Sequence, residues 1–316
     1  MSEVKDQRPP AIFLLGPTAS GKTDLAVSLV EQLPCEIISV DSALVYRGMD
    51  IGTAKPDAAT LSRAPHHLID IRDPADAYSA GDFRRDALEA MQEITQAGKI
   101  PLLAGGTSLY FQRLLAGDSN LPAADPQLRE KLERQLQELG CPALHQRLAA
   151  VDPESARRIA PTDPQRTLRA LELWELTGKT RTQLWAEQPR TEFAWRTLQL
   201  GLAPRDRKLL HERIELRFAK MLKEGFIEEV AQLKQRDDLH DGLPSMRSVG
   251  YRQVWQYLDG ELNRQEMFEK GVAATRQLAK RQLTWMRSWQ ALHWLASEAR
   301  DLTPQVLNLA QGFCRK

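Results

Sequence analysis

The sequence predicts an α/β protein whose core is a mostly parallel sheet and which carries an all-helical insertion. Short apolar runs typical of buried strands alternate with longer stretches whose apolar residues recur at helical spacing, as expected of a parallel sheet with helical crossovers. In the middle of the chain the strand-like runs disappear while the helical spacing continues. We therefore expect a core formed by residues 1–120 and 195–316, with a helical insertion domain at residues 121–194.

The first predicted strand leads into a loop built to bind phosphate. The apolar residues 11–15 are followed by GPTASGKT at residues 16–23, which fits the pattern G-x-x-x-x-G-K-[ST] at every specified position. In this pattern backbone amides encircle a phosphate, the lysine adds a positive charge and the final hydroxyl reaches Mg²⁺. Residues 22–33 predict a helix whose first amides face the loop, so the core is predicted to be P-loop NTPase-like. The residues assigned to phosphate binding are Gly16, Thr18, Ala19, Ser20, Gly21, Lys22 and Thr23, with Thr23 also assigned to the metal.

Two further predicted strands end in polar residues. The run 36–41 ends in Asp41, and the run 100–104 is followed by Gly105-Gly106-Thr107. Residues 83–94 carry apolar side chains at helical spacing and predict the helix between these strands. Because ligands of parallel sheets bind beyond the carboxyl ends of the strands, we expect Asp41 and Thr107 to face the phosphate loop.

The rest of the chain predicts mainly helices. The run 197–202 indicates a return to the sheet, and an apolar stripe over residues 210–221 predicts a long helix that ends near Gly225. Leucines recur at helical spacing in the insertion, and they are Leu128, Leu132, Leu136 and Leu139.

Composition limits the class of protein. The chain has 43 Lys and Arg against 42 Asp and Glu, so a nucleic-acid partner would have to be bound by a local basic patch. Its three cysteines are far apart and form no C-x-x-C, which argues against a disulfide framework and a zinc site. The polar N-terminus has no signal-peptide core, and no apolar run approaches the ~20 residues of a membrane span. We expect a cytoplasmic, monomeric protein with no membrane partner.

Eight further stretches follow the phosphate loop in a fixed order. They are DSALVY at 41–46, DIGTAKP at 50–56, PHHLID at 65–70, YSAGDF at 78–83, GGTSLY at 105–110, DPQR at 163–166, RSVGYR at 247–252 and TRQLAKRQ at 275–282. Together with GPTASGKT they closely resemble the bacterial tRNA dimethylallyltransferases, also called tRNA isopentenyltransferases, over about residues 11–289. One such stretch would be weak evidence, whereas the ordered set is highly specific.

The resemblance implies that the loop binds the diphosphate of dimethylallyl diphosphate and not a nucleoside triphosphate. The allyl group would pass to N6 of the adenosine 3′ of the anticodon, adenosine-37, in tRNAs reading codons that begin with U, and diphosphate would be released. Mg²⁺ is the implied cofactor, and the anticodon stem-loop of tRNA is the implied partner. A phosphate loop with Lys22 and Mg²⁺ suits this chemistry, because the leaving diphosphate needs its charge neutralised.

Three residues are assigned to the chemistry. Asp41 is the candidate general base for the proton of the attacking amine, with a Walker-B-like role in ordering the metal through water as the alternative. The resemblance implies that Thr107 contacts the diphosphate near the departing oxygen, and a helix N-cap is a compatible second role. It also implies that Arg217 binds the diphosphate, whereas the alternative for this arginine is a solvated helix face.

The predicted RNA contacts combine family stretches with a basic helix. Between residues 276 and 289 there are four positive residues and no acidic one, which predicts a basic ridge for RNA phosphates or, alternatively, an ordinary solvated face. The residues assigned to tRNA are Asp41, Ser42, Ala43, Leu44, Thr107, Gln165, Arg166, Arg169, Arg247, Arg252, Arg276, Lys280, Arg281 and Arg287. Eukaryotic relatives often have glutamine where this chain has Ala43-Leu44, which leaves backbone or Ser42 contacts as the alternative way to read the base.

Three other functions remain as alternatives. A P-loop kinase acting on a small hydroxyl substrate would consume ATP. An adenylate isopentenyltransferase would modify free AMP, although the insertion and the basic helix favour a large RNA. A non-catalytic RNA-binding protein with a relic loop is the third, and the intact Asp41 and Thr107 argue against it. The adjacent His66 and His67 lack a nearby third ligand, so we expect them to have a structural or hydrogen-bonding role.

Overall fold

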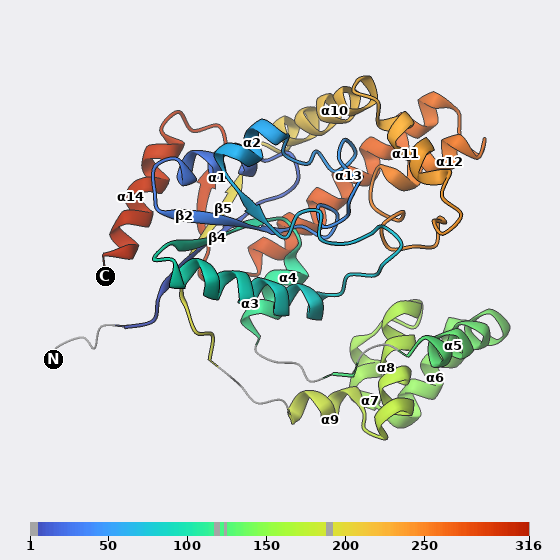
Figure 1. Ribbon diagram of the computed structural model, residues 1–316. Helices are drawn as coiled ribbons and strands as arrows, with labels where there is room; N and C mark the ends of the chain where they lie inside the picture. The colour runs from blue at the N-terminus through green and yellow to red at the C-terminus, as the bar shows by residue number, and fades with distance from the viewer. Residues whose placement is uncertain (1–5, 117–120, 123–124, 188–191, 316) are drawn as a thin grey trace. The chain divides into compact units, whose positions relative to one another are not determined.

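The computed structural model describes residues 6–116, 121–122, 125–187 and 192–315. The chain divides into two compact units (Figure 1). Residues 116–192 form one unit, and the two segments that flank them, 1–115 and 193–316, together form the other.

The larger unit contains a six-stranded sheet in the order β3-β2-β4-β1-β5-β6, in which every neighbouring pair is parallel. The predicted α/β class with a mostly parallel sheet is confirmed. The strands are β1 (Pro10–Leu15), β2 (Cys35–Val40), β3 (His66–His67), β4 (Ile100–Gly105), β5 (Arg196–Ala203) and β6 (His293–Ala296).

The central strands are buried on both faces, which explains why they appear in the sequence as continuous apolar runs. In the register of the sheet, Ile12 of β1 lies between Leu102 of β4 and Leu198 of β5. The two edge strands were not predicted. They are only two and four residues long and partly exposed, so neither leaves an apolar run in the sequence.

Two helical layers cover the sheet. The helices of this unit are α1 (Lys22–Val30), α2 (Ala58–Arg63), α3 (Ala80–Gln96), α4 (Ser108–Leu115), α10 (Arg207–Lys223), α11 (Phe226–Lys234), α12 (Tyr251–Leu258), α13 (Arg264–Arg287) and α14 (Leu302–Cys314). Ile12 and Leu14 share one core with α1 and α14, whereas Phe13 and Leu15 on the opposite face share a second core with α3, α4, α10 and α13. Because successive side chains of β1 point to opposite faces of the sheet, this strand contributes to both cores of the larger unit.

The predicted long helix is α10. Its apolar stripe, Leu210, Ile214, Phe218 and Met221, is buried. The helix ends at Lys223, and Gly225 follows with φ of 101°, a left-handed conformation that suits glycine and starts α11.

The smaller unit is all-helical. Its helices are α5 (Pro126–Leu139), α6 (Cys141–Val151), α7 (Pro153–Arg158), α8 (Pro164–Thr177) and α9 (Arg181–Ala186). Three of them begin with an Asp-Pro pair in which the aspartate accepts a hydrogen bond from the first turn. Leu132, Leu144 and Leu171 belong to a separate core of this unit, whereas Leu139, the last residue of α5, is exposed.

Across the described ranges, no helix combines the length and the apolar character that crossing a membrane requires.

Candidate functional site

The phosphate loop connects β1 to α1 at the carboxyl edge of the sheet. Gly21, with φ of 86°, is the N-cap of α1, and Ala19 also has a left-handed backbone with φ of 62°. At Gly16 the backbone is so crowded that a Cβ atom would lie 2.6 Å from the carbonyl oxygen of Leu202. The glycines of the motif are therefore required by the geometry of the loop.

Lys22, Asp41 and Arg217 meet beside this loop. Burial lowers the pKa of Lys22 to about 8, while the Asp41 charge acts to raise that pKa and the Arg217 charge acts to lower it. Burial also lowers the pKa of Arg217, and the charge of Asp41 opposes that shift. The three charges come from α1, the end of β2 and α10, so the fold brings distant parts of the sequence to one site.

Hydrogen bonds hold two of these side chains in place. The Lys22 ammonium donates to the carbonyl of Pro17, with 2.9 Å between the two atoms. The Arg217 guanidinium donates to the carbonyl of Thr53 at 3.1 Å. Arg217 is thus half-buried and bonded to the protein, and it does not lie on a fully solvated helix face.

Asp41 and Thr107 lie at the ends of the adjacent strands β2 and β4. One Asp41 oxygen accepts the amide hydrogen of Ala43 at 2.9 Å, closing a tight turn after β2. The Thr107 hydroxyl oxygen accepts the amide hydrogen of Ser42 at 3.1 Å, and the Thr107 amide donates to the carbonyl of Val40 at 3.2 Å. These bonds tie Thr107 to the turn that carries Asp41.

The donors near the loop fit a magnesium ion. Thr23, in the first turn of α1, is exposed, and Asp41 offers one carboxylate. The buried Ser20 hydroxyl in the same loop has no hydrogen-bond partner, so the loop retains unused polar capacity for an anionic ligand. Mg²⁺ is usually bound by one or two protein oxygens together with waters and substrate phosphates. The Thr23 hydroxyl and the Asp41 carboxylate provide such oxygens. No group of three or more His, Cys, Asp or Glu residues in the described ranges could hold a metal on its own.

The comparison with known proteins decides the family. The model of the family described as IPP transferase matches residues 44–289. The chain belongs to the IPP transferase family. The predicted family resemblance is confirmed, and the chain is an enzyme of the transferase class.

Individual relatives can be aligned with almost the whole of this chain. The chain is 55% identical over 309 residues to the tRNA dimethylallyltransferase of Chromohalobacter salexigens, covering 98% of this chain and 99% of that protein. The crystal structure of the tRNA isopentenylpyrophosphate transferase of Bacillus halodurans has a TM-score of 0.70 at 34% identity and covers 98% and 97% of the two chains. A eukaryotic dimethylallyltransferase acting on tRNA reaches a TM-score of 0.83 at 25% identity, covering 96% of this chain and 79% of that one.

A half-buried carboxylate accounts for two of the sequence stretches that mark the family. Glu229 of α11 accepts the amide hydrogens of Asp50 at 2.8 Å, Ile51 at 2.6 Å and Gly52 at 3.1 Å. The hydroxyl of Tyr251 donates to the same carboxylate at 2.5 Å. DIGTAKP therefore supplies the amides and RSVGYR supplies the tyrosine. Sequence reasoning missed Glu229, because its partners are more than 170 residues away along the chain except for Tyr251.

This clamp supports the loop that binds Arg217. Thr53, whose carbonyl accepts the Arg217 guanidinium, directly follows the three clamped amides. A Cβ atom at Gly52 would lie 2.1 Å from the Phe226 ring, so only glycine allows the loop to approach α11 this closely. The Glu229 clamp thus connects α11 to the loop whose Thr53 carbonyl holds Arg217.

Glu229→Ala is expected to lower the free energy of unfolding by about 2 kcal/mol, because three backbone amides and a buried tyrosine hydroxyl would lose their acceptor. Urea unfolding at constant pH measures the effect. The neighbouring Glu228→Ala, at an exposed position on the same helix, is the control and should change stability by less than about 0.5 kcal/mol. Equal losses for the two variants would contradict the clamp.

The basic helix predicted to contact RNA is α13. Lys280, Arg281 and Arg287 are exposed on it. Arg276 is half-buried instead and is paired with Glu215 of α10 at 2.7 Å, while also donating to the carbonyl of His211. Its guanidinium therefore joins α13 to α10.

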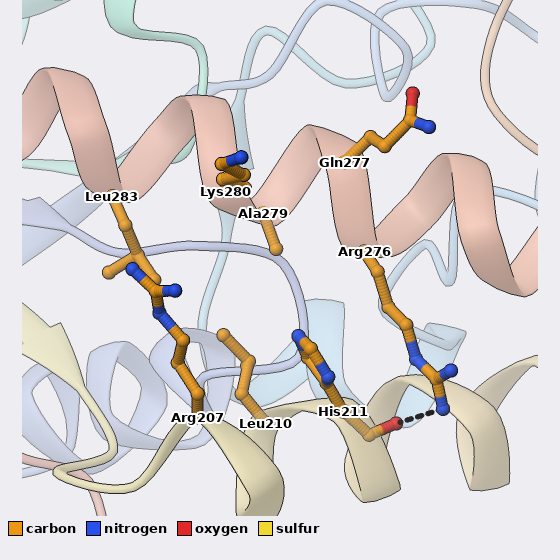
Figure 2. A pocket seen from close by; sticks show the side chains of 8 residues that line it. All are labelled: Arg207, Leu210, His211, Arg276, Gln277, Ala279, Lys280 and Leu283. Carbon is orange, nitrogen blue, oxygen red and sulfur yellow. Dashed lines mark hydrogen bonds between the residues drawn. The ribbon is translucent and has the colours of Figure 1, made fainter.

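Figure 2 shows the groove between α10 and α13. Apolar side chains of Leu210, Ala279 and Leu283 line it together with Gln277 and with four basic residues, Arg207, His211, Arg276 and Lys280. Of these four, the sequence predicts only Arg276 and Lys280 of α13 as RNA contacts. The other two come from α10, and only the packing of the two helices reveals that they share this groove.

The remaining residues assigned to tRNA fall in several places. Ser42 is exposed, whereas Ala43 and Leu44 are half-buried in the turn after β2. Arg247 and Arg252 are exposed around the start of α12. In the helical unit, Gln165 and Arg166 are exposed at the start of α8.

Arg169 of the helical unit is engaged within the protein. It pairs with the buried Glu172 at 2.7 Å and donates to the carbonyl of Pro122 at 2.5 Å. Glu172 also accepts the amide hydrogen of Asp125. Arg169 thus helps to fix the chain segment that enters this unit.

The adjacent histidines take part in hydrogen bonds. His66 Nδ1 lies 2.6 Å from the carbonyl of Ala64, and His67 Nε2 lies 2.8 Å from a Glu36 carboxylate oxygen. Burial lowers the pKa of His66.

Proposed function

We propose that the protein transfers the dimethylallyl group of dimethylallyl diphosphate to N6 of adenosine-37 in tRNAs reading codons that begin with U, with Mg²⁺ as cofactor. The observation that carries the proposal is the meeting of Lys22, Arg217 and Asp41 beside the phosphate loop, two cations for a diphosphate and one carboxylate for a proton. The relatives named as tRNA dimethylallyltransferases support tRNA as the acceptor. A tRNA substrate also supports a cytoplasmic location.

The reaction forms a bond between N6 and the terminal allylic carbon and breaks the bond between that carbon and the diphosphate oxygen, whose electron pair leaves with the diphosphate. The loop amides, Lys22 and Arg217 would hold the diphosphate and stabilise its growing charge. Asp41 would accept the proton that N6 releases. Thr107 would hold the turn that carries Asp41 and contact the diphosphate. Mg²⁺, when bound, supplies further neutralisation of the diphosphate charge.

The RNA backbone would be bound by the exposed cations of α13, Lys280, Arg281 and Arg287, together with Arg207 and His211 along the α10–α13 groove. Arg276 would have to leave Glu215 to join them, and Arg169 would have to leave Glu172. The target adenosine would leave the anticodon stack to reach Asp41.

The test is to incubate the protein and Mg²⁺ with an unmodified tRNA that carries adenosines at and beside position 37, and to weigh the RNA by mass spectrometry. We expect the RNA to gain one five-carbon unit with dimethylallyl diphosphate and nothing with ATP. The matched control is the same tRNA with guanosine at position 37, which should gain nothing.

Two results would overturn the proposal. Prenylation of AMP with no modification of tRNA would make the protein an adenylate isopentenyltransferase. Consumption of ATP on a small hydroxyl substrate, with no transfer from dimethylallyl diphosphate, would make it a kinase.

A further inference from the structure

The amide group of one glutamine links the two turns that form the candidate site. Gln282 of α13 accepts the amide hydrogen of Thr18 at 2.9 Å through Oε1 and donates to the carbonyl of Gly106 at 3.0 Å through Nε2. Thr18 belongs to the phosphate loop, and Gly106 directly precedes Thr107. Gln282 is therefore bonded to both turns at once.

Glutamine suits this position because its amide offers an acceptor and a donor at the same end of the side chain. Glutamate has the same length but cannot donate to the Gly106 carbonyl when ionised. The position opposite the amide is equally constrained, since a Cβ atom on Gly106 would lie 2.3 Å from Nε2 of Gln282. The second glycine of GGTSLY thus leaves space for this side chain.

The helix that carries Gln282 is firmly anchored. Ala279, Leu283 and Met286 on either side of it are buried in the core that α13 shares with α10 and α4. A side chain on an anchored helix can hold a loop at a fixed distance, because its own backbone does not move with the loop.

We propose that Gln282 is a positioning residue that sets the distance between the phosphate loop and Thr107. Its amide acts through Thr18 and Gly106, and it does not itself bind the diphosphate. The inference rests on the proposed function, in which the loop and Thr107 grip the same diphosphate. A diphosphate displaced by about an ångström is poorly placed for transfer, which can reduce the rate by roughly 100-fold.

Gln282→Ala removes both bonds. We expect kcat/KM for dimethylallyl diphosphate to fall roughly 10- to 100-fold. The dissociation constant for tRNA should stay within about twofold, because Lys280, Arg281 and Arg287 are untouched. Gln282→Glu should be more harmful than Gln282→Ala, since it places a negative oxygen against the Gly106 carbonyl. The control is Thr284→Ala, an exposed position two residues further along α13, which should leave both kcat/KM and the dissociation constant for tRNA unchanged.

A double-mutant cycle distinguishes positioning from a general loss of structure. Gly106→Ala pushes a methyl group into the glutamine amide and should lower kcat/KM by a similar factor in the otherwise unchanged protein. In the Gln282→Ala background this clash is gone and the Gly16 carbonyl oxygen, 3.1 Å from the added Cβ atom, is the close contact that remains, so Gly106→Ala should cost much less there than in the unchanged protein. Losses that multiply in the double variant would overturn the proposal, as would full activity of Gln282→Ala.

Inorganic pyrophosphate provides a readout that does not depend on transfer. We expect calorimetry to show weaker pyrophosphate binding to Gln282→Ala than to the unchanged protein and to Thr284→Ala. If the unchanged protein transferred no prenyl group, the proposed function would fail, and this titration would still decide the inference. Equal affinities of Gln282→Ala and Thr284→Ala for pyrophosphate would contradict a positioning role.

Discussion

Replacing Asp41 by asparagine is expected to lower kcat for prenyl transfer by roughly 10²–10⁴-fold, the usual contribution of a general base. Asparagine retains the side-chain oxygen that accepts the Ala43 amide hydrogen, so the turn after β2 keeps its shape. What is lost is the basicity that removes the proton from N6. Single-turnover kinetics with saturating tRNA measures the chemical step directly. The affinity for tRNA, followed by a filter-binding or anisotropy titration, should be nearly preserved.

Asp41→Ala tests the contribution of the turn as well as that of the base. We expect its kcat to be as low as that of Asp41→Asn, with a small additional loss of stability because the Ala43 amide loses its acceptor. The matched control is Asp237→Asn, an exposed carboxylate in the segment between α11 and α12, which should not alter either rate or binding. Equal losses of turnover and of tRNA affinity in both Asp41 variants would be evidence against the general base.

A magnesium titration separates the general base from the alternative in which Asp41 orders the metal through water. If Asp41 acts only through the metal, raising the Mg²⁺ concentration should restore much of the rate of Asp41→Asn. If Asp41 accepts the proton, the rate should remain low at every Mg²⁺ concentration. Its charge acts on both Lys22 and Arg217, so either role uses the same position.

Much of the fold could be predicted because its decisive signals are local. The phosphate loop depends on glycines and a lysine at fixed spacing, and the helix that follows begins at Lys22, as expected. Asp41 and Thr107 were predicted to lie together because they end apolar runs, and the ends of parallel strands meet at one edge. The edge strands β3 and β6 gave no such signal, since a strand of two or four half-exposed residues needs no apolar pattern.

The bonds that hold the site together could not be predicted in the same way. Gln282 is separated from Thr18 by 264 residues, and Glu229 from Asp50 by 179. Such contacts depend on how helices pack on the sheet, and no single sequence reports this. The sequence of α13 alone also does not reveal that Arg276 is paired within the protein, because its partner Glu215 lies on α10.

Pyrophosphate binding is expected to weaken as the pH rises above about 8, because burial lowers the pKa of Lys22 to about 8. A bound diphosphate favours the charged ammonium and raises that pKa. Below about pH 7 Lys22 is already protonated and adds no pH dependence. Above about 8 the protein must take up a proton to bind, so the affinity should fall toward tenfold per pH unit. Calorimetry from pH 6.5 to 9.5 would measure it, and two buffers of different ionisation enthalpy would report the proton uptake.

Lys22→Met serves as the reference for this titration, because it removes the charge and retains much of the side chain's length. At pH 7 it should bind pyrophosphate roughly 10- to 100-fold more weakly than the unchanged protein, which corresponds to the loss of a charged hydrogen bond. Pyrophosphate itself titrates identically in both experiments, so dividing the affinity of the unchanged protein by that of Lys22→Met removes this contribution. That ratio should shrink as the pH rises, since the lysine of the unchanged protein also loses its charge. A ratio that stays constant up to pH 9.5 would show that Lys22 keeps its proton throughout, in contradiction to the effect of burial.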